Sequence, residues 1–395
     1  MIIKRHINIF QWLLCSIVIV LFSACSSSDA GEETVGATHK QPMLAIYVYA
    51  PEQAAAQKSA EQTRADVGEV DPINNTTNEG TIKSLQIWVY ESSETGNNVG
   101  YFSTNDVAAL NEGQGTTYQI PVSDDFASSK PAVNVYVMAN VTSANCGIGT
   151  LNKETTRVAL QDGAKITGGP SGHFGLEQNT RSVPTDGLPF AGMLTGQAVV
   201  GDAPTLRVGT LSAVSTVQLT RAVSKLRFVF AKTIGEAKVS IKNITMNEQM
   251  IPETEYLFKA TSMPYNTTAA ELLSTAIDDI AETADPTQYL YLGQDAQEYE
   301  NLINEAASKQ PKEVTVEGPI YLRESDKQLA GTITYTIGGG EDKTVDFAMQ
   351  QAGDFSRNHT WIVYAYYAGA GKLQVQSLYV KNWSTKEMNY EFFNW

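Results

Sequence analysis

The sequence predicts an all-β protein with a minor helical component, built as two antiparallel β-sandwich domains in series. From residue 43 onward, short runs of β-branched and aromatic residues recur between clusters of Gly, Asn, Asp, Ser and Pro. Helical periodicity is scarce, and many short strands joined by turn-rich loops indicate a sandwich or a barrel. The 395 residues give enough length for two sandwiches.

The N-terminus has the pattern of an export signal. Residues 4–6 are basic, residues 7–22 are predominantly apolar, and small residues precede Cys25. The apolar run is too short, and too soon followed by polar residues, for a membrane span. A cysteine in this position resembles a bacterial lipobox, although Phe22 departs from the usual Leu, Val or Ile. We therefore expect a signal peptide over residues 1–24 and a lipid anchor (diacylglycerol and palmitate) on Cys25. An ordinary secretory peptide with a chance cysteine is the alternative.

Cysteine usage and charge restrict the class of protein. Cys15 lies in the signal and Cys25 at the lipobox, so Cys146 stands alone and is predicted to be a half-buried structural residue. Neither a disulfide framework nor a cysteine metal cluster is expected. The formal net charge of −15 argues against nucleic-acid binding, which needs basic patches, and suits a soluble surface protein.

The strand pattern begins after a flexible tether. Residues 26–40 are rich in Ser, Gly, Glu and Thr and lack apolar periodicity. The first strand covers residues 43–50, in which Leu44, Ile46 and Val48 alternate onto one face that points into a core. The clearest further strands are predicted over residues 82–90, 132–139, 215–219, 224–231, 237–246, 331–337, 361–367 and 373–380.

Two stretches have helical pattern. Residues 268–283 space Leu272, Leu273, Ile277 and Ile280 along one stripe, and a shorter candidate covers residues 298–307.

The domain boundary is placed near residues 210–214, after a short run at 205–208. This gives an N-terminal sandwich of residues 65–213 and a C-terminal sandwich of residues 214–395.

The sequence supplies no catalytic residue, metal site or cofactor site. None of His39, His173 and His359 lies at metal-ligand spacing from another histidine, and His359 is interpreted as structural. Nucleotide, hydrolase and metalloprotease motifs are absent, and residues 338–340 (GGG) fit a hairpin loop. The remaining acid pairs are interpreted as a solvated helix face at Asp278-Asp279 and a turn at Asp124-Asp125. We therefore expect a protein that is not an enzyme.

Six segments follow the order of one family. They are the lipobox at Cys25; residues 63–65 with 78–79 and 82–90; residues 132–140 (AVNVYVMAN); residues 188–193 (LPFAGM), with Phe190 in place of a Met; residues 217–228 (VQLTRAVSKLRF); and residues 357–361 (RNHTW). Together they resemble the fimbrillin family of Bacteroidetes, whose members form major and minor fimbriae.

The resemblance implies transthyretin-like sandwiches, export to the outer membrane and maturation by an Arg-specific protease. In this family the protease removes the first strand, and a strand of another subunit fills the open groove by strand addition. On this chain the scissile bond would join Arg64 to Ala65, so residues 25–64 would be a removable segment carrying Leu44, Ile46 and Val48. A solvated loop with a chance arginine is the alternative, and Arg181 is the rival site.

The C-terminal end offers two candidate donor strands. One contains Leu373 and Val375; the other is residues 388–395, in which Met388, Tyr390 and Phe392 alternate on one face. Alternatively, both strands close the sheet of their own domain.

Two functional hypotheses follow. In the first, the chain is a stalk or tip subunit of a cell-surface fimbria that polymerises with copies of itself or with related subunits and supports adhesion. In the second it is a non-polymerising surface lipoprotein, either a fimbrial anchor or a glycan- or protein-binding sandwich. An anchor would keep its lipid and first strand, whereas a glycan binder would need exposed aromatic residues, of which Trp383 and Trp395 are candidates. The sequence does not identify a host or bacterial ligand. Hydrolysis by a hidden carboxylate pair is a distant third hypothesis.

Overall fold

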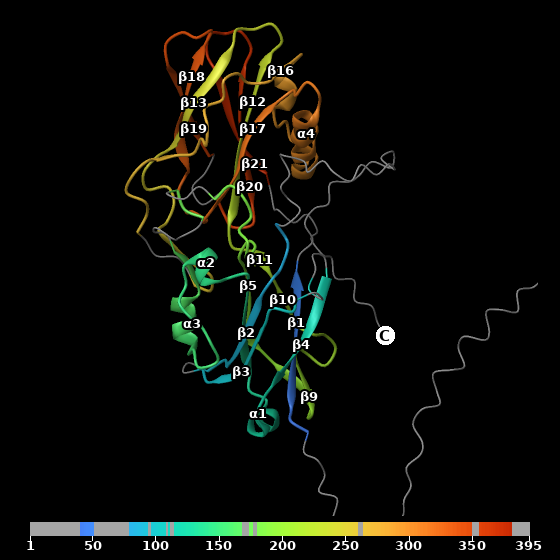
Figure 1. Cartoon of the computed structure of the whole chain (residues 1–395). Helices are drawn as coiled ribbons and strands as arrows, with labels where there is room; N and C mark the ends of the chain where they lie inside the picture. Colours follow the sequence, from blue (N-terminus) through green and yellow to red (C-terminus); the bar gives the residue numbers. More distant parts are fainter. Residues whose placement is uncertain are drawn as a thin grey trace, which may run out of the picture. The chain divides into compact units, whose positions relative to one another are not determined.

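Two β-sandwiches account for most of the regular structure (Figure 1). The computed structural model describes residues 40–50, 79–93, 96–107, 110, 114–167, 174–176, 180–259, 264–349 and 355–380. The described residues from 41 onward belong to one compact unit. The prediction of an all-β fold of two sandwiches with minor helix is confirmed. The described part contains four α-helices: α1 (Asp124–Ser129), α2 (Ser143–Cys146), α3 (Arg157–Gly163) and α4 (Ala296–Ser308).

The first sandwich consists of two five-stranded sheets around one hydrophobic cluster. One sheet contains β8 (Val199–Asp202), β9 (Thr205–Val208), β10 (Thr216–Gln218), β1 (Met43–Ala50) and β4 (Gln114–Pro121). The other has the order β11 (Thr220–Arg221), β7 (Phe190–Gln197), β5 (Val133–Ala139), β2 (Leu85–Glu91) and β3 (Asn98–Thr104). The cluster draws buried side chains from both sheets, including six of the seven residues of β5.

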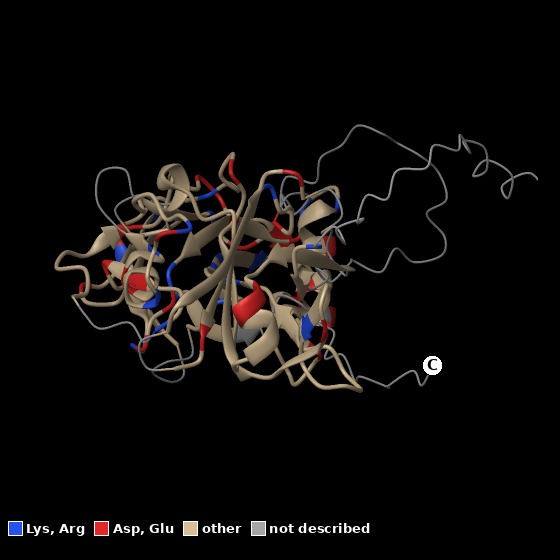
Figure 2. Cartoon of the chain, turned by 90° about the horizontal axis from the view of Figure 1, so that it is seen from below, with Lys and Arg blue, Asp and Glu red and all other residues tan. Residues whose placement is uncertain are grey.

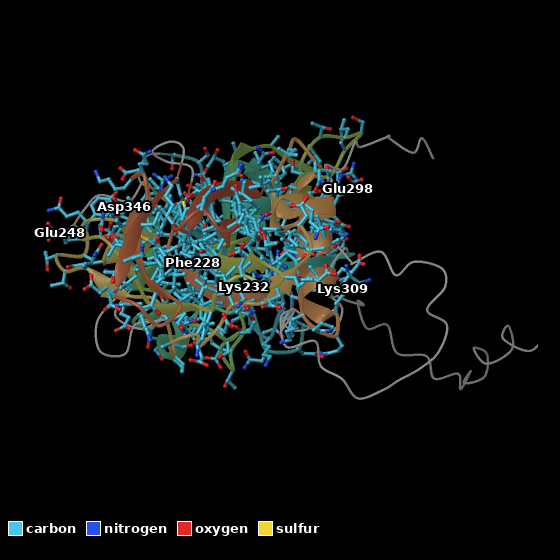
Figure 3. The ribbon with its side chains drawn as sticks, turned by 90° about the horizontal axis from the view of Figure 1, so that it is seen from above. Phe228, Lys232, Glu248, Glu298, Lys309 and Asp346 are labelled. Carbon is cyan, nitrogen blue, oxygen red and sulfur yellow. The ribbon has the colours of Figure 1, made fainter. Side chains whose placement is uncertain are left out.

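The second sandwich pairs a five-stranded sheet with a four-stranded one. The larger sheet contains β16 (Glu282–Thr283), β17 (Thr315–Leu322), β12 (Ser224–Thr233), β20 (Thr360–Tyr367) and β21 (Gln374–Val380). The smaller has the order β15 (Ala270–Glu271), β13 (Val239–Met246), β18 (Ala330–Ile337) and β19 (Lys343–Ala348). Phe228 lies among the side chains between the sheets, whereas Asp346 lies at the periphery (Figure 3).

A third hydrophobic cluster joins α4 and the short helix η3 (Pro286–Tyr289) to the larger sheet of the second sandwich. Tyr299 and Ile303 of α4 are buried in it, while Glu298 lies on the exposed side of the helix. A two-stranded sheet of β6 (Lys165–Thr167) and β14 (Thr254–Tyr256) connects a segment of the first half of the chain to one of the second.

Most strand pairs are antiparallel, but both sandwiches contain parallel pairs. β1 runs parallel to β9 and β10, and β12 runs parallel to β16 and β20. The central strands are therefore held by mixed ladders, which the predicted antiparallel sandwiches did not include.

The chain passes from the first set of sheets to the second between Val223 and Leu226. β10 and β11 follow residue 213, yet they pair with β1 and β7 of the first sandwich. The chain therefore leaves the first sandwich about ten residues later than the predicted boundary at 213/214. That the two parts are independent domains stays a prediction.

The predicted helix over residues 268–283 is wrong. Residues 270–280 run along the free edge of β13, where Leu272 N donates to Ile244 O at 2.7 Å and Ile280 N donates to Val239 O at 3.0 Å. Leu272, Leu273 and Ile280 are buried as the stripe requires. The open edge of β13 supplies hydrogen bonds that override the helical pattern. The shorter predicted helix at 298–307 is confirmed as α4.

The acidic pairs also differ from prediction. Asp278 and Asp279 are exposed as predicted, but neither lies on a helix; Asp278 pairs with Lys238 at 2.6 Å and Asp279 with Lys232 at 2.9 Å. Asp124-Asp125 is the first turn of α1, capped by Ser123, rather than a simple turn. The hairpin at residues 338–340 is confirmed between β18 and β19.

Candidate functional site

The first strand is the central feature of its sheet. β4 pairs with β1 along all eight residues, from Met43↔Pro121 to Ala50↔Gln114. On the other side, β9 pairs with Met43–Ala45 and β10 with Tyr47–Tyr49. β1 is the only strand of the described chain with which β4 forms a ladder. We call the space that β1 occupies, between β4 on one side and β9 and β10 on the other, the β1 slot.

The inward face of β1 is buried as the alternation predicts. Leu44, Ile46 and Val48 are at most 1% exposed. Paired residues of neighbouring strands point to the same face of a sheet, which places Ile120 and Leu206 on either side of Leu44. Burial of three such side chains is worth about 5–9 kcal/mol at roughly 1.5–3 kcal/mol each. That amount compares with the roughly 5–15 kcal/mol by which a whole domain is stable.

The outward face of β1 is not fully solvated, which corrects the expectation of a strand with only one face buried. Tyr49 is only 8% exposed and Tyr47 is partly buried. The ring of Tyr47 lies directly over Gly115 of β4, where a Cβ would collide with it. A glycine in this position of the neighbouring strand makes room for an aromatic ring across the ladder.

The segment that follows the predicted cleavage site is anchored at Glu79. Its carboxylate contacts Lys225 Nζ at 3.4 Å and accepts a hydrogen bond from the hydroxyl of Tyr321, and its backbone oxygen accepts from Arg221 Nε at 3.2 Å. Glu79, Lys225 and Tyr321 are buried. Burial lowers the pKa of Lys225, although Glu79 and Glu300 oppose that shift. These contacts tie the residues just before β2 to the second half of the sequence.

The two arginines that were weighed as cleavage sites have different settings. Arg64 and Ala65 lie outside the described residues. Arg181 forms an ion pair with Glu317 and its side chain is 24% exposed. Its neighbour Thr180 accepts a hydrogen bond from the backbone of Tyr321 at 2.8 Å. These contacts hold Arg181 in folded structure, whereas proteases cut most readily in exposed loops.

Of the two candidate donor strands, only the first lies in the described residues. Leu373 is buried, its backbone N–H donates to Tyr335 Oη at 3.1 Å, and Val375 packs against the second core. β21 pairs with β20 over seven residues and contributes the buried Leu378. β21 thus closes its own sheet in this structure. Met388, Tyr390 and Phe392 lie outside the described residues, as does Cys25.

Cys146 is fully buried in α2, not half-buried as predicted, and burial raises the pKa of its thiol. The two strand tryptophans, Trp88 in β2 and Trp361 in β20, are buried and offer no exposed aromatic platform. His359 contacts backbone oxygens of its own loop through Nδ1, which fits the predicted structural role. Trp383 and Trp395 lie outside the described residues.

Residues from the family-like segments contact one another. Asn140 has a left-handed backbone (φ 57°), and its Nδ2 donates to Thr81 O at 2.7 Å and to Leu188 O at 2.9 Å. It thus joins the starts of β2 and β7. Arg221 Nη1 donates to Asn358 Oδ1 at 3.3 Å, which links the segment 217–228 to the segment 357–361.

Sequence reasoning missed two parts of the candidate site, the strand β4 and the buried Glu79. Residues 117–120 (TYQI) alternate polar and apolar side chains after a glycine, which is a short strand signal. Glu79 was part of a family-like segment, but nothing in the sequence shows that it is buried against a lysine far along the chain.

Charge and composition give no sign of a catalytic centre in the described residues. Basic and acidic residues are interspersed over the ribbon (Figure 2). No group of three or more His, Cys, Asp or Glu side chains there is arranged to hold a metal. Among the helices that the structure describes, none has the length and apolar character to cross a membrane. By its fold, the chain is a two-sandwich β protein with a buried central first strand.

Comparison with known proteins then finds one family model that matches part of the chain. Residues 44–221 match the family model described as major fimbrial subunit protein (FimA). The resemblance to fimbrillins is therefore confirmed over this part of the chain, which includes the β1 slot. The match supports a structural or adhesive role in a cell-surface fimbria, in assembly with other fimbrial subunits. It points to a structural protein rather than an enzyme.

Solved structures of similar proteins cover nearly the whole chain at low identity. The tip fimbrial protein Mfa3 of Porphyromonas gingivalis, solved with a C-terminal truncation, is 12% identical, covers 86% of this chain and 99% of its own, and has a TM-score of 0.46. A fimbrial assembly protein of Parabacteroides distasonis is 12% identical over 86% of this chain and 99% of its own, with a TM-score of 0.44. No curated protein sequence matches the chain.

Proposed function

We propose that the chain is a stalk or tip subunit of a fimbria that polymerises by strand exchange in the β1 slot. In this proposal the protein is exported as an outer-membrane lipoprotein through Cys25. An Arg-specific protease cuts after Arg64, β1 leaves, and a strand of another subunit takes its place.

The observation that carries the proposal is the position of β1. It is the ladder partner of β4, it separates β4 from β9 and β10, and it contributes three buried apolar side chains. Its loss would leave an apolar groove with hydrogen-bonding edges on both sides, which is a template for strand addition. An unfilled groove of this kind is unstable, so occupation by another strand would drive assembly.

The contacts of Glu79 support the proposal that β1 can be released while the rest of the subunit stays folded. Breaking a buried pair such as Glu79–Lys225 costs about 3–5 kcal/mol, so the mature chain keeps a strong contact on the C-terminal side of the cut. The donor is proposed to come from residues 388–395 rather than from β21. Withdrawal of β21 would expose Leu373 and Leu378 and break seven pairs with β20.

The first test is mass spectrometry of the N-terminus of the protein recovered from the cell surface. An N-terminus at Ala65, with residues 25–64 gone, supports the polymerising subunit. An acylated Cys25 with Met43–Ala50 retained refutes strand loss. The fully paired and buried state of β1 in this structure is the observation that would then favour the non-polymerising anchor.

A further inference from the structure

The strand that flanks the β1 slot on the side opposite β4 is interrupted at its middle. Ala45 pairs with Arg207 of β9, and Tyr47 pairs with Thr216 of β10, both in parallel register. Only Ile46 lies between the two paired residues of β1, whereas eight residues, 208–215, lie between their partners. The extra residues form a loop opposite Ile46. We call residues 209–215, between the end of β9 and the start of β10, the slot loop.

The slot loop is an ordered small hairpin. Ser215 N donates to Val208 O at 2.9 Å, Thr210 N donates to Ala213 O at 2.8 Å, and Gly209 N donates to Ala198 O at 2.9 Å. Arg207 Nη2 donates to Leu211 O at 2.6 Å. Gly209 takes a φ of +136°, where a Cβ would meet the backbone of Ala213. The loop conformation is therefore fixed from several sides.

The tip of this fixed loop is apolar and exposed. Leu211 is 80% exposed and Val214 is 47% exposed. A single exposed leucine is common on protein surfaces. A leucine held at the tip of an ordered loop is different, because its backbone does not have to be ordered again when a partner binds. The slot loop contains no charged residue, so it fits an apolar protein surface rather than an anionic glycan or a lipid headgroup.

We infer that the slot loop is a docking surface for a second copy of this chain, the copy whose strand fills the β1 slot. The inference rests on the proposed function and adds a contact outside the slot. Fifteen residues, 381–395, follow β21. If eight of them replace the eight residues of β1, seven remain as a linker, which spans at most about 25 Å at roughly 3.3–3.6 Å per residue.

The slot loop lies close enough to both ends of the β1 slot for a donor subunit on such a linker to contact it. An eight-residue strand is roughly 26 Å long, so a loop at its middle lies about 13 Å along the strand from either end. A folded domain of about 100 residues has a radius of gyration of about 13 Å. A donor body tethered within about 25 Å of either end of the slot can therefore contact Leu211, whichever direction its strand runs.

The test compares a whole subunit with a free peptide. Full chain carrying Leu211→Ser is cut after Arg64 with an Arg-specific protease, and two rates are measured. One is elongation by further subunits; the other is binding of a synthetic peptide of residues 388–395, which has no body to reach the loop. Val158→Ser, at a residue of α3 that is 64% exposed, is the matched control.

We expect Leu211→Ser to slow elongation or weaken subunit association by about tenfold or more, the scale set by burial of one leucine, and to leave peptide binding unchanged. Equal loss in both measurements would show that the loop only supports the slot, and would overturn the inference. Normal elongation in the variant would overturn it as well, while the proposed function would stand. If neither subunit nor peptide binds the cut wild-type chain, strand exchange itself fails and the inference fails with it.

A second readout uses thiol protection. In cut chain carrying Leu211→Cys, Cys146 is the only other cysteine, and it is buried. Alkylation of the new cysteine is expected to slow at least about tenfold on assembly, as for a site that is open in under a tenth of the molecules. A cysteine placed by Val158→Cys should change little. Equal rates before and after assembly at residue 211 would refute the contact.

Discussion

Truncation of Leu44 separates the stability of the precursor from that of the assembled subunit. Leu44 is fully buried between Ile120 and Leu206. Leu→Ala at such a site costs about 2–5 kcal/mol, because the transfer free energy is lost and a cavity remains. In uncut chain, Leu44→Ala should lower the free energy of unfolding of the first sandwich by that amount.

If strand exchange replaces β1 in the assembled subunit, as proposed, the same substitution should cost nothing there. The two forms are compared by urea denaturation and by hydrogen exchange of the β4 amides. Leu292→Ala, at a residue 79% exposed, is the matched control and should be neutral in both forms. After cleavage, the Leu44→Ala chain should also release β1 more readily than the cut wild-type chain. A loss of 2–5 kcal/mol shifts the equilibrium for release of β1 by about 30-fold to about 5,000-fold.

Equal destabilisation of precursor and polymer would show that β1 stays in place, and it would refute the strand-exchange reasoning. A neutral effect in the precursor would instead contradict the packing of Leu44. The two outcomes can be told apart in uncut chain. Leu44→Ala destabilises the uncut chain strongly if only strand exchange is wrong, and has no effect on it if the packing of Leu44 is wrong.

Three further outcomes are expected. Arg64→Ala should leave the N-terminal segment attached and abolish polymer growth, as judged by mass spectrometry and electron microscopy, whereas Arg181→Ala should permit normal maturation and cost at most a few kcal/mol in stability through loss of its contact with Glu317. When the cut chain loses β1, the amides of β4 should exchange rapidly and be protected again on addition of a peptide of residues 388–395; unchanged protection after the cut would contradict the dependence of β4 on β1. Burial raises the pKa of Glu255 from 4.5 to about 8, against the effect of Arg357, so the folded chain holds a proton that the unfolded chain has released. Stability should therefore fall as pH rises from about 5 to about 8, and Glu255→Gln should flatten that dependence in thermal melts; an unchanged slope would show that another group controls it.

Local alternation was enough to locate the strands that matter most. Residues 43–50 were predicted as a strand with Leu44, Ile46 and Val48 inward, and β1 has those bounds and that burial. A central strand carries its apolar side chains at period two, so its sequence contains the information. Runs of β-branched and aromatic residues located β5 and β12, which were predicted over residues 132–139 and 224–231.

Pairing between distant segments was not predictable. The neighbours of β1 come from residues 114–121, 205–208 and 216–218, and no local pattern specifies which strands meet or in which direction. The error at residues 268–283 has the same origin. Leu272, Leu273 and Ile280 had to be buried, and both a helix and an extended edge segment achieve that. The free edge of β13 decided the outcome, and that edge exists only in the folded chain.

The unequal ladders of β1 indicate how it would leave. β4 pairs with all eight residues in antiparallel register, whereas the opposite side offers three pairs with β9 and three with β10, separated by the slot loop. Parallel pairs are slightly less stable per residue than antiparallel ones. Separation should therefore begin on the side of β9 and β10, near Ile46, where the ladder is already broken. Release of β1 from the cut chain would then start on that side and end at β4, so that the three buried apolar side chains are exposed in turn and not all at once. Such a route reconciles a strand buried as deeply as β1 with its replacement at a useful rate, because each step exposes only one or two of the three apolar side chains at a time.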